Sequence, residues 1–496
     1  MMRFLRFFPV LAVLPLVASA GGWVIVNEDN DGFFVRERPN ISTRDLDERI
    51  DELLSGGRVT HVFWCVNGCR PNYDSKVWEP IWTALEDPQA NYSDTPRLWP
   101  ENVKALFDRG IDPAKYWIEK ARQKGASPWV SMRMNDNHYI WIPHAARVCR
   151  FNQEHPEWWV VPHYTGGQWE PYALDFARKE VRDHTFALVD EIVRRYDADG
   201  IELDFCRAVT YFNETNAVRC TPVMTAFIAR CRAAAQAEAA RRKRPYAVAI
   251  RLAHDPETAR RRGFDAVEIV RRGLVDAIIV CSDAADMGWD RSFEAWRRVL
   301  GEAAPQVRLV AGTTGGFSLS RRLHNPASLR AWAELQRDAG AKDLYIFNHQ
   351  YMTKAARSAV CDGTAFAATP AAGPREFVVS QIIPPTGDLP PRRIIPANLA
   401  EKPSLPVHLP KDITAWKSVE VIFGHKLETP FVGEVRLNGC ASTGGEETEE
   451  DGVRLVRRVF PLSALKGGES EISFSGSGPD AVTWVSLRVD VRPSGP

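Results

Sequence analysis

The segment from 196 to 207, with the sequence YDADGIELDFCR, constrains what this chain can fold into more than any other. In its second half, apolar residues alternate with Glu202 and Asp204. Successive side chains of a β-strand point to opposite faces, so this period of two places both carboxylates on one face. A buried carboxylate without a partner is costly. Such a face therefore needs cations, hydrogen-bond donors or a ligand nearby.

A helical stretch, Glu180–Tyr196, leads directly into this strand. A helix followed by an acid-tipped strand is the repeating unit of a TIM barrel, in which the chemistry lies at the C-terminal ends of the strands. Similar strand signals recur along the chain between helical segments. The sequence therefore predicts an α/β fold, a parallel (β/α)8 barrel rather than an open doubly wound sheet. The predicted strands are Trp23–Asn27, Val59–Val66, Trp129–Arg133, Gly200–Phe205, Ala247–Arg251, Ala277–Cys281, Val307–Ala311 and Leu344–Phe347.

Composition divides the chain into three predicted parts. Residues 1–20 have the pattern of a cleavable signal peptide: two arginines, a short apolar run and an Ala-Ser-Ala site. The alternative is an uncleaved anchor. We expect the barrel in 21–372. After a proline-rich boundary, 373–496 carries short alternating strands typical of a β-sandwich-like accessory domain. The expected location is secreted or periplasmic.

The charge balance and the missing motifs exclude several function classes. Lys+Arg and Asp+Glu both number 63, so no basic field indicates nucleic acid or anionic lipid. No later apolar run approaches the ~20 residues of a membrane span. Metal and nucleotide motifs are absent, and we expect neither a metal nor a cofactor. Nine cysteines leave at least one unpaired within the chain, and Cys65 and Cys69 either bridge a loop or remain free thiols.

Several segments resemble the glycosyl-hydrolase-like TIM-barrel family of exported bacterial proteins, called glycosyl-hydrolase-like family 10. That family has a Leu-Asp…Glu-Val-Arg segment followed by an Asp-Gly-Ile-x-Leu-Asp-Tyr-x-Arg strand, and here Phe205 replaces the tyrosine. The resemblance covers roughly 23 to 356 and implies a barrel that acts on carbohydrate. The matching segments are LDFARKEVR (174–182), IVRRYDADGIELDFCR (192–207), HPEW (155–158) and GLVD (273–276).

A second comparison concerns the family 18 chitinases, which carry Asp-Gly-x-Asp-x-Asp-x-Glu on strand four with the last glutamate as the acid. Aligning Asp199 and Gly200 with that pattern places Glu202 and Asp204 on its middle acids. Cys206 then occupies the position of the catalytic glutamate. This departure argues against chitinase chemistry.

The predicted catalytic residues are Asp204, Asp283 and Glu202. Asp204 lies at the strand tip, where many retaining glycosidases place a nucleophile. Glu202 lies one pleat deeper and is either catalytic or part of a buried cluster with Arg133 and Arg251, on the two flanking strands. Such a cluster would keep Asp204 ionised.

A second carboxyl group is needed as general acid. Asp283, after strand six, is the leading candidate, while Asp255 and Asp136 compete with it. Each of these aspartates is alternatively a helix cap.

Other polar and aromatic residues near the strand ends are candidates for binding a carbohydrate substrate. A long aromatic-rich loop, from 134 to about 174, supplies several of them, and loops of this length inside a compact domain are usually functional. The predicted substrate-binding residues are Arg133, Asn135, Asp136, His138, Trp141, Arg207, Arg251, His254, Asn348 and His349.

Two functions follow. The first is a secreted glycoside hydrolase that cleaves O-glycosidic bonds of a polysaccharide or glycan with paired carboxyl groups. The alternative is a non-catalytic carbohydrate-binding or cell-envelope protein on a degenerate TIM barrel, because fold alone does not determine function.

Overall fold

The computed structural model contains the barrel and a C-terminal β-rich region. Asp283 and the predicted signal peptide (1–20) lie outside the described residues. The structure describes residues 22–29, 31–55, 57–93, 95–207, 209–281, 289–290, 292–315, 325–361, 373–379, 382–383, 392–393, 395, 397–398, 401, 403–426, 430–450, 453–476 and 482–491.

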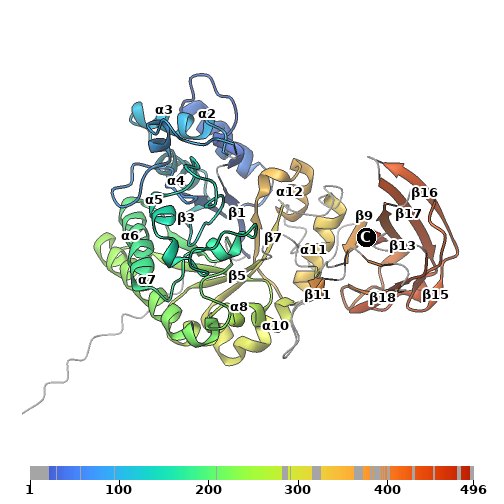
Figure 1. Ribbon diagram of the computed structural model, residues 1–496. Coiled ribbons are helices and arrows are strands. Elements are labelled where there is room, and N and C mark those ends of the chain that lie inside the picture. The colour runs from blue at the N-terminus through green and yellow to red at the C-terminus, as the bar shows by residue number, and fades with distance from the viewer. Residues whose placement is uncertain are drawn as a thin grey trace, which may run out of the picture.

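Strands β1 to β8 form a closed parallel barrel in chain order, with β8 hydrogen-bonded to β1 (Figure 1). This confirms the predicted fold class, and the strands at 277–281 and 344–347 have the predicted bounds. The strands are β1 (Val24–Glu28), β2 (His61–Cys65), β3 (Ser127–Arg133), β4 (Gly200–Asp204), β5 (Ala247–Ala253), β6 (Ala277–Cys281), β7 (Arg308–Thr314) and β8 (Leu344–Phe347).

Helices surround the barrel, and their starts follow local sequence chemistry. The side chain of Asp112 accepts a hydrogen bond from the amide of Lys115, and Pro113 occupies the first turn, which together begin α4. The helices are α1 (Asp31–Phe34), α2 (Thr43–Leu54), α3 (Leu98–Asp108), α4 (Pro113–Gln123), α5 (Arg150–Glu154), α6 (Lys179–Arg195), α7 (Thr221–Arg242), α8 (Pro256–Arg261), α9 (Ala266–Arg271), α10 (Ser292–Leu300), α11 (Pro326–Asp338) and α12 (Lys354–Cys361). Short 3-10 helices are η1 (Ile81–Leu85), η2 (Pro156–Trp158), η3 (Glu170–Tyr172), η4 (Ala217–Cys220), η5 (Gly301–Gln306) and η7 (His349–Tyr351).

The lower part of the barrel lumen is apolar and filled. Phe63 and Trp129 stack there with ring centroids 4.9 Å apart. Gly200 makes room for this indole, because a Cβ at that position would lie 2.7 Å from the Trp129 ring. Because apolar side chains fill this lower part, the polar side chains of the lumen lie at its C-terminal end.

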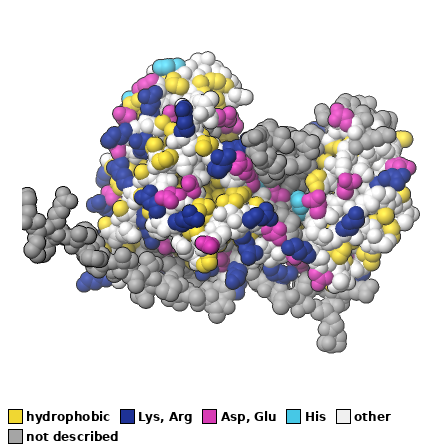
Figure 2. Space-filling view, turned by 90° about the horizontal axis from the view of Figure 1, so that it is seen from below, with side chains coloured by type: hydrophobic (Ala, Val, Ile, Leu, Met, Phe, Trp, Pro, Cys, Tyr) yellow, Lys and Arg dark blue, Asp and Glu magenta, His cyan; other side chains and the backbone are white. Residues whose placement is uncertain are grey.

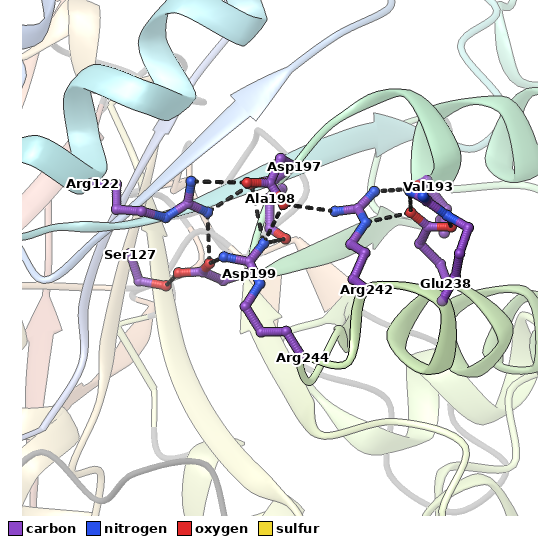
Figure 3. Close-up of polar contacts among 10 residues, drawn as sticks. Arg122, Ser127, Val193, Asp197, Ala198, Asp199, Glu238, Arg242 and Arg244 are labelled. Carbon is purple, nitrogen blue, oxygen red and sulfur yellow. Dashed lines mark hydrogen bonds and ion pairs between the residues drawn. The ribbon is translucent and has the colours of Figure 1, made fainter.

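The first half of the segment 196–207 lies at the opposite, N-terminal face of the barrel, where Figure 3 shows a network of arginines and aspartates. Asp199 accepts hydrogen bonds from Ser127 Oγ (2.7 Å) and Arg122 Nη2 (2.9 Å). Arg244 Nη2 donates to Asp197 Oδ1 at 2.6 Å. These acids tie the segment between α6 and β4 to β3, to α4 and to the residues that follow α7. In a TIM barrel this face serves stability rather than chemistry.

Among its described residues, the C-terminal region forms two larger antiparallel sheets beside α11 and α12 and a two-stranded antiparallel pair, β10-β11 (Figure 1). One sheet has the order β12-β18-β14-β15 and the other β16-β17-β13-β19-β9. Figure 2 shows cationic and anionic side chains intermixed over the visible face of both parts. The strands are β9 (Gly373–Val378), β10 (Ile382–Ile383), β11 (Arg392–Arg393), β12 (Ser404–His408), β13 (Trp416–His425), β14 (Val435–Leu437), β15 (Cys440–Ala441), β16 (Gly444–Glu450), β17 (Val453–Phe460), β18 (Glu469–Phe474) and β19 (Val482–Val491), with η10 (Leu462–Ala464).

A buried ion pair joins the two parts. Arg375 on β9 donates to Glu334 on α11 through Nε (2.8 Å) and Nη2 (2.7 Å). Asn325, the N-cap of α11, also donates to Glu376 at 2.9 Å. The accessory sheets are therefore seated on the barrel through α11.

Candidate functional site

Asp204 ends β4 inside the barrel and lies level with Arg133 on β3 and Arg251 on β5. Arg251 donates from Nε to Asp204 Oδ1 and from Nη2 to Asp204 Oδ2, both at 2.8 Å. Both side chains are almost completely buried, with 1% of each exposed. This bidentate geometry is the strongest form of arginine–carboxylate pairing. The predicted pairing of Arg251 with Asp204 is confirmed.

The prediction for Arg133 is only half right. Its side chain points inward, but it pairs with Asp136 (Nη1 to Oδ2, 2.6 Å) and with Asp29. Arg251 already occupies both oxygens of Asp204. Asp29 and Asp136 are also buried carboxylates, at the ends of β1 and β3. They need a cation more than Asp204 does, because Asp204 already has Arg251.

Glu202 lies one pleat deeper on β4 and is completely buried. Asn27 Nδ2 and the Tyr345 hydroxyl both donate to its Oε2 at 3.3 Å. Burial, and then the negative charge of Asp204, raise the pKa of Glu202 to about 7. At neutral pH a large fraction of this carboxyl group is therefore protonated and neutral, while its neighbour is ion-paired.

This shifted pKa predicts how stability depends on pH. The folded-state pKa of Glu202 lies above its unfolded value of 4.5. Between these values the folded chain binds more protons than the unfolded chain, so its stability falls as pH rises from about 4.5 to about 7. We expect the free energy of unfolding to lose about 3 kcal/mol across this window through Glu202. Urea denaturation at several pH values measures it.

The Glu202→Gln variant should keep its stability through the same window, because glutamine mimics the neutral acid. Glu302→Gln, at an exposed glutamate of η5, is the matched control and should retain the wild-type slope. Identical slopes for wild type and Glu202→Gln would contradict the environment described for Glu202.

His138 contacts the buried Arg133–Asp136 pair and is itself partly exposed. Its Nδ1 lies 2.5 Å from Asp136 Oδ1, and its backbone amide donates to the same oxygen at 3.1 Å. Burial alone would raise the pKa of Asp136, but His138 and Arg133 hold it well below its usual range. A quarter of the His138 side chain is exposed, whereas that of Asp136 is fully enclosed. The imidazole therefore lies between the buried charges and the solvent. Its Nδ1 is hydrogen-bonded to the Asp136 carboxylate.

Asn135 has a structural role. Its Nδ2 donates to the carbonyls of Leu174 and Thr210, both at 3.0 Å, and its Oδ1 accepts from the Leu174 amide. The side chain thus fastens both ends of the long loop that follows β3. The Arg207 guanidinium lies 5.9 Å from the Phe347 ring centroid, close to Arg251, which lies 3.9 Å from it.

His349 lies in a different environment from the one predicted. It is completely buried outside the lumen, with Nε2 3.1 Å from Glu28 Oε2 and Nδ1 3.2 Å from Arg357 Nη1. Arg49 Nη2 reaches the same Glu28 oxygen at 2.5 Å. These charges join β1 to α2 and α12. The histidine therefore belongs to the polar cluster where β1 meets α2 and α12. Asn348, just before it, is 2% exposed and adopts a left-handed conformation with φ 52°.

The residues after β5 also serve the scaffold. His254 Nε2 lies 3.2 Å from Asp290 Oδ2. Asp255 accepts a hydrogen bond from the amide of Thr258 at 2.7 Å and so caps α8. This contact corresponds to the helix-cap alternative considered for Asp255. Asp283, the leading candidate for general acid, lies outside the described residues.

Sequence reasoning missed several members of the lumen cluster. Asn27 lies in β1 two positions after Ile25, and Asp29 follows the strand two positions later, so both continue its lumen face. Tyr345 alternates with the apolar residues of β8 and shares that face. Period-two alternation would have indicated them, as it indicated Glu202. Short strands give this signal weakly, because only two or three residues of each face are available.

Within the part of the chain that the structure describes, no group of three or more His, Cys, Asp or Glu is placed to hold a metal ion. No helix there has both the length and the apolarity needed to cross a membrane. Cys69 is a buried free thiol, so the predicted alternative of a bridge to Cys65 is not formed. Of the nine cysteines, Cys440 is exposed and the other eight are at least partly buried.

No protein-family model and no curated protein matches the chain. Similar solved structures include a chitinase from Paenibacillus sp. str. FPU-7, with 12% identity over 95% of this chain and 54% of that chain and a TM-score of 0.42. Others are the endo-β-1,4-mannanase from Thermotoga petrophila (11% identity, 96% and 99% coverage, TM-score 0.45) and a bacterial fucosidase (10%, 92% and 92%, TM-score 0.36). The chain spans about half the length of that chitinase. At these values the likeness concerns fold alone, and no residue role is taken from it.

Proposed function

We propose that this protein is a secreted glycoside hydrolase that cleaves O-glycosidic bonds of a glycan, as the family resemblance implies. The observation that carries the proposal is a pair of buried carboxyl groups on β4 in opposite environments. Asp204 is fixed by a bidentate arginine, and the pKa of Glu202 is raised to about 7 by burial and by Asp204. Paired titratable groups with diverging environments are typical of acid–base sites. Export follows from the predicted signal peptide, and an intact Met1 in the mature protein would contradict it.

In the proposed mechanism, Asp204 stabilises the positive charge that develops at the anomeric carbon of the sugar. Arg251 holds this carboxylate in one orientation. Glu202, when protonated, adds no second negative charge beside it. The proton donor must stand closer to solvent. Asp283 remains the proposed general acid. His138 is oriented by Asp136 and partly exposed, but burial lowers its pKa, so its imidazole suits hydrogen bonding to a sugar hydroxyl better than proton donation.

One observation favours the second candidate function, carbohydrate binding without catalysis. Asp204 Oδ1 accepts from Arg251 and also from the amides of Cys206 (2.9 Å) and Arg207 (3.2 Å). Both oxygens of this carboxylate are therefore already engaged by donors of the protein itself. It suits an electrostatic or structural role better than covalent catalysis. If it is structural, the barrel binds glycan without cleaving it.

The experiment is a screen of the purified full chain against soluble polysaccharides and aryl glycosides. New reducing ends or released aglycone are measured, with the Asp204→Asn variant as the blank. We expect wild-type protein to cleave at least one class and the blank to be inactive. Equal product from both proteins, or none from wild type across the screen, would contradict the hydrolase proposal and favour the binding function.

A further inference from the structure

The long loop after β3 builds an open groove of about 490 Å³ beside the mouth of the barrel. Trp141 lines it and is 43% exposed, an unusual exposure for so large an apolar side chain. Trp159, Tyr164 and Tyr172 complete the aromatic lining, and His144, Gln153 and Thr165 add polar groups. The His144 Nδ1 lies 3.3 Å from Asp87 Oδ2. The volume lies within the ~300–1,000 Å³ that is typical of ligand sites.

The aromatic side chains of the groove are fixed in place by one another. The Tyr172 ring lies 5.6 Å from Trp141, 5.0 Å from Trp159 and 5.1 Å from Tyr164, measured between ring centroids. Its hydroxyl donates to the Gly166 carbonyl at 3.0 Å, and the Trp159 indole donates to the Asn152 carbonyl at 2.7 Å. A platform held this way needs little reordering when a ligand binds.

A row of packed aromatic rings connects the groove to the candidate catalytic site. The Tyr139 ring lies 5.8 Å from the His138 ring on one side and 5.8 Å from the Trp141 ring on the other. His138 in turn contacts Asp136 of the lumen cluster. Trp169, which is 37% exposed, stacks beside His138 at 6.2 Å. A row of rings therefore runs from the lumen mouth to the groove.

The chemistry of the lining indicates the class of ligand. Among the described residues that form the groove, none is Asp, Glu, Lys or Arg. Flat aromatic faces pack against the C–H face of a pyranose ring, and neutral amide, hydroxyl and imidazole groups pair with its hydroxyls. A charged polymer would find no counter-ion in this lining. The groove therefore suits an uncharged sugar.

We propose that the groove binds a neutral glycan chain whose neighbouring sugar residues occupy the barrel mouth. The substrate is then a polymer that the loop after β3 binds along its length. This inference rests on the proposed function for the position of the cleaved bond, while the binding itself does not depend on cleavage. It assigns Trp141 and Tyr164 to a binding subsite remote from Asp204.

The test is affinity electrophoresis of the full chain in native gels that contain hydroxyethylcellulose, glucomannan or mixed-linkage β-glucan, with polygalacturonate as the charged comparison. We expect at least one neutral polymer to retard wild type. Trp141→Ala should weaken the apparent affinity at least tenfold, and Trp141→Phe should restore most of it. Leu462→Ala, at an exposed apolar side chain of the accessory domain, is the control and should migrate as wild type does.

The outcomes separate the groove from the hydrolase. Retardation of Asp204→Asn equal to wild type, without hydrolysis by either protein, supports the groove and contradicts the proposed function. Hydrolysis of short aryl glycosides without retardation by any neutral polymer overturns the groove and leaves the function standing. Retardation by polygalacturonate alone, or equal retardation of wild type and Trp141→Ala, also overturns it.

Discussion

Replacing Asp204 with asparagine is expected to lower kcat for glycan hydrolysis by about 10²–10⁴-fold with a small change in KM. Asparagine keeps the size and most hydrogen bonds of the side chain but removes its negative charge. That charge matters most where positive charge develops in the transition state, so kcat and kcat/KM should fall together. Steady-state kinetics on whichever glycan the wild type cleaves measures the effect, and circular dichroism verifies the fold.

Asp199→Asn is the matched control for this variant. Asp199 lies five positions earlier, at the other end of the same strand, and is likewise paired with an arginine, Arg122 (Figure 3). Its change alters an aspartate–arginine contact on the N-terminal face, so kcat should remain at the wild-type value. Near-wild-type turnover by Asp204→Asn would exclude Asp204 as the key carboxylate and move that role to Glu202.

Replacing Arg251 with methionine is expected to lower the free energy of unfolding by about 3–5 kcal/mol. Methionine fills similar space but leaves Asp204 as a buried charge without its cation. The loss is large because both side chains are 1% exposed and water cannot take the place of the guanidinium. Urea denaturation followed by near-ultraviolet circular dichroism measures the change.

Two further variants show whether the loss comes from the broken pair. Arg122→Met removes an arginine whose side chain is 36% exposed, and it should cost less than about 1 kcal/mol. The double variant Arg251→Met with Asp204→Leu removes both charges and should recover much of the loss, because apolar replacement of a whole buried pair is often neutral. A cost of Arg251→Met no larger than that of Arg122→Met would show that the pair is not buried as described.

The alternation of residues on β4 predicted most of the inner site. It placed Glu202 and Asp204 on the lumen face, and the flanking strands supplied Arg251 at the same level. This prediction succeeded because the period of a strand and the register of a parallel barrel largely fix the direction of each side chain on the strands. The same reasoning placed Arg133 level with Asp204, which the register confirms.

The choice of partner could not be predicted in this way. Arg133 turns to Asp29 and Asp136, and His349 turns away from the lumen to Glu28. Each side chain is long or lies past the end of its strand, so its direction is not set by the strand period. It is set instead by which opposite charges surrounding strands bring within reach, and those lie more than a hundred residues away for Asp29 and Glu28.

The barrel, its strands and the face to which the β4 acids point follow from the sequence, because they depend on the local periodicity of side chains. The partner of each charged side chain depends instead on the folded arrangement. One carboxylate, Asp204, is locked by an arginine, and Glu202 beside it is kept largely neutral by burial and by that charge. The tertiary structure also brings the aromatic side chains of the loop together as a groove, with the Tyr139 ring between Trp141 and His138. Both depend on distances between strands and loops far apart in the chain, and solvation and Coulomb energies change steeply with those distances.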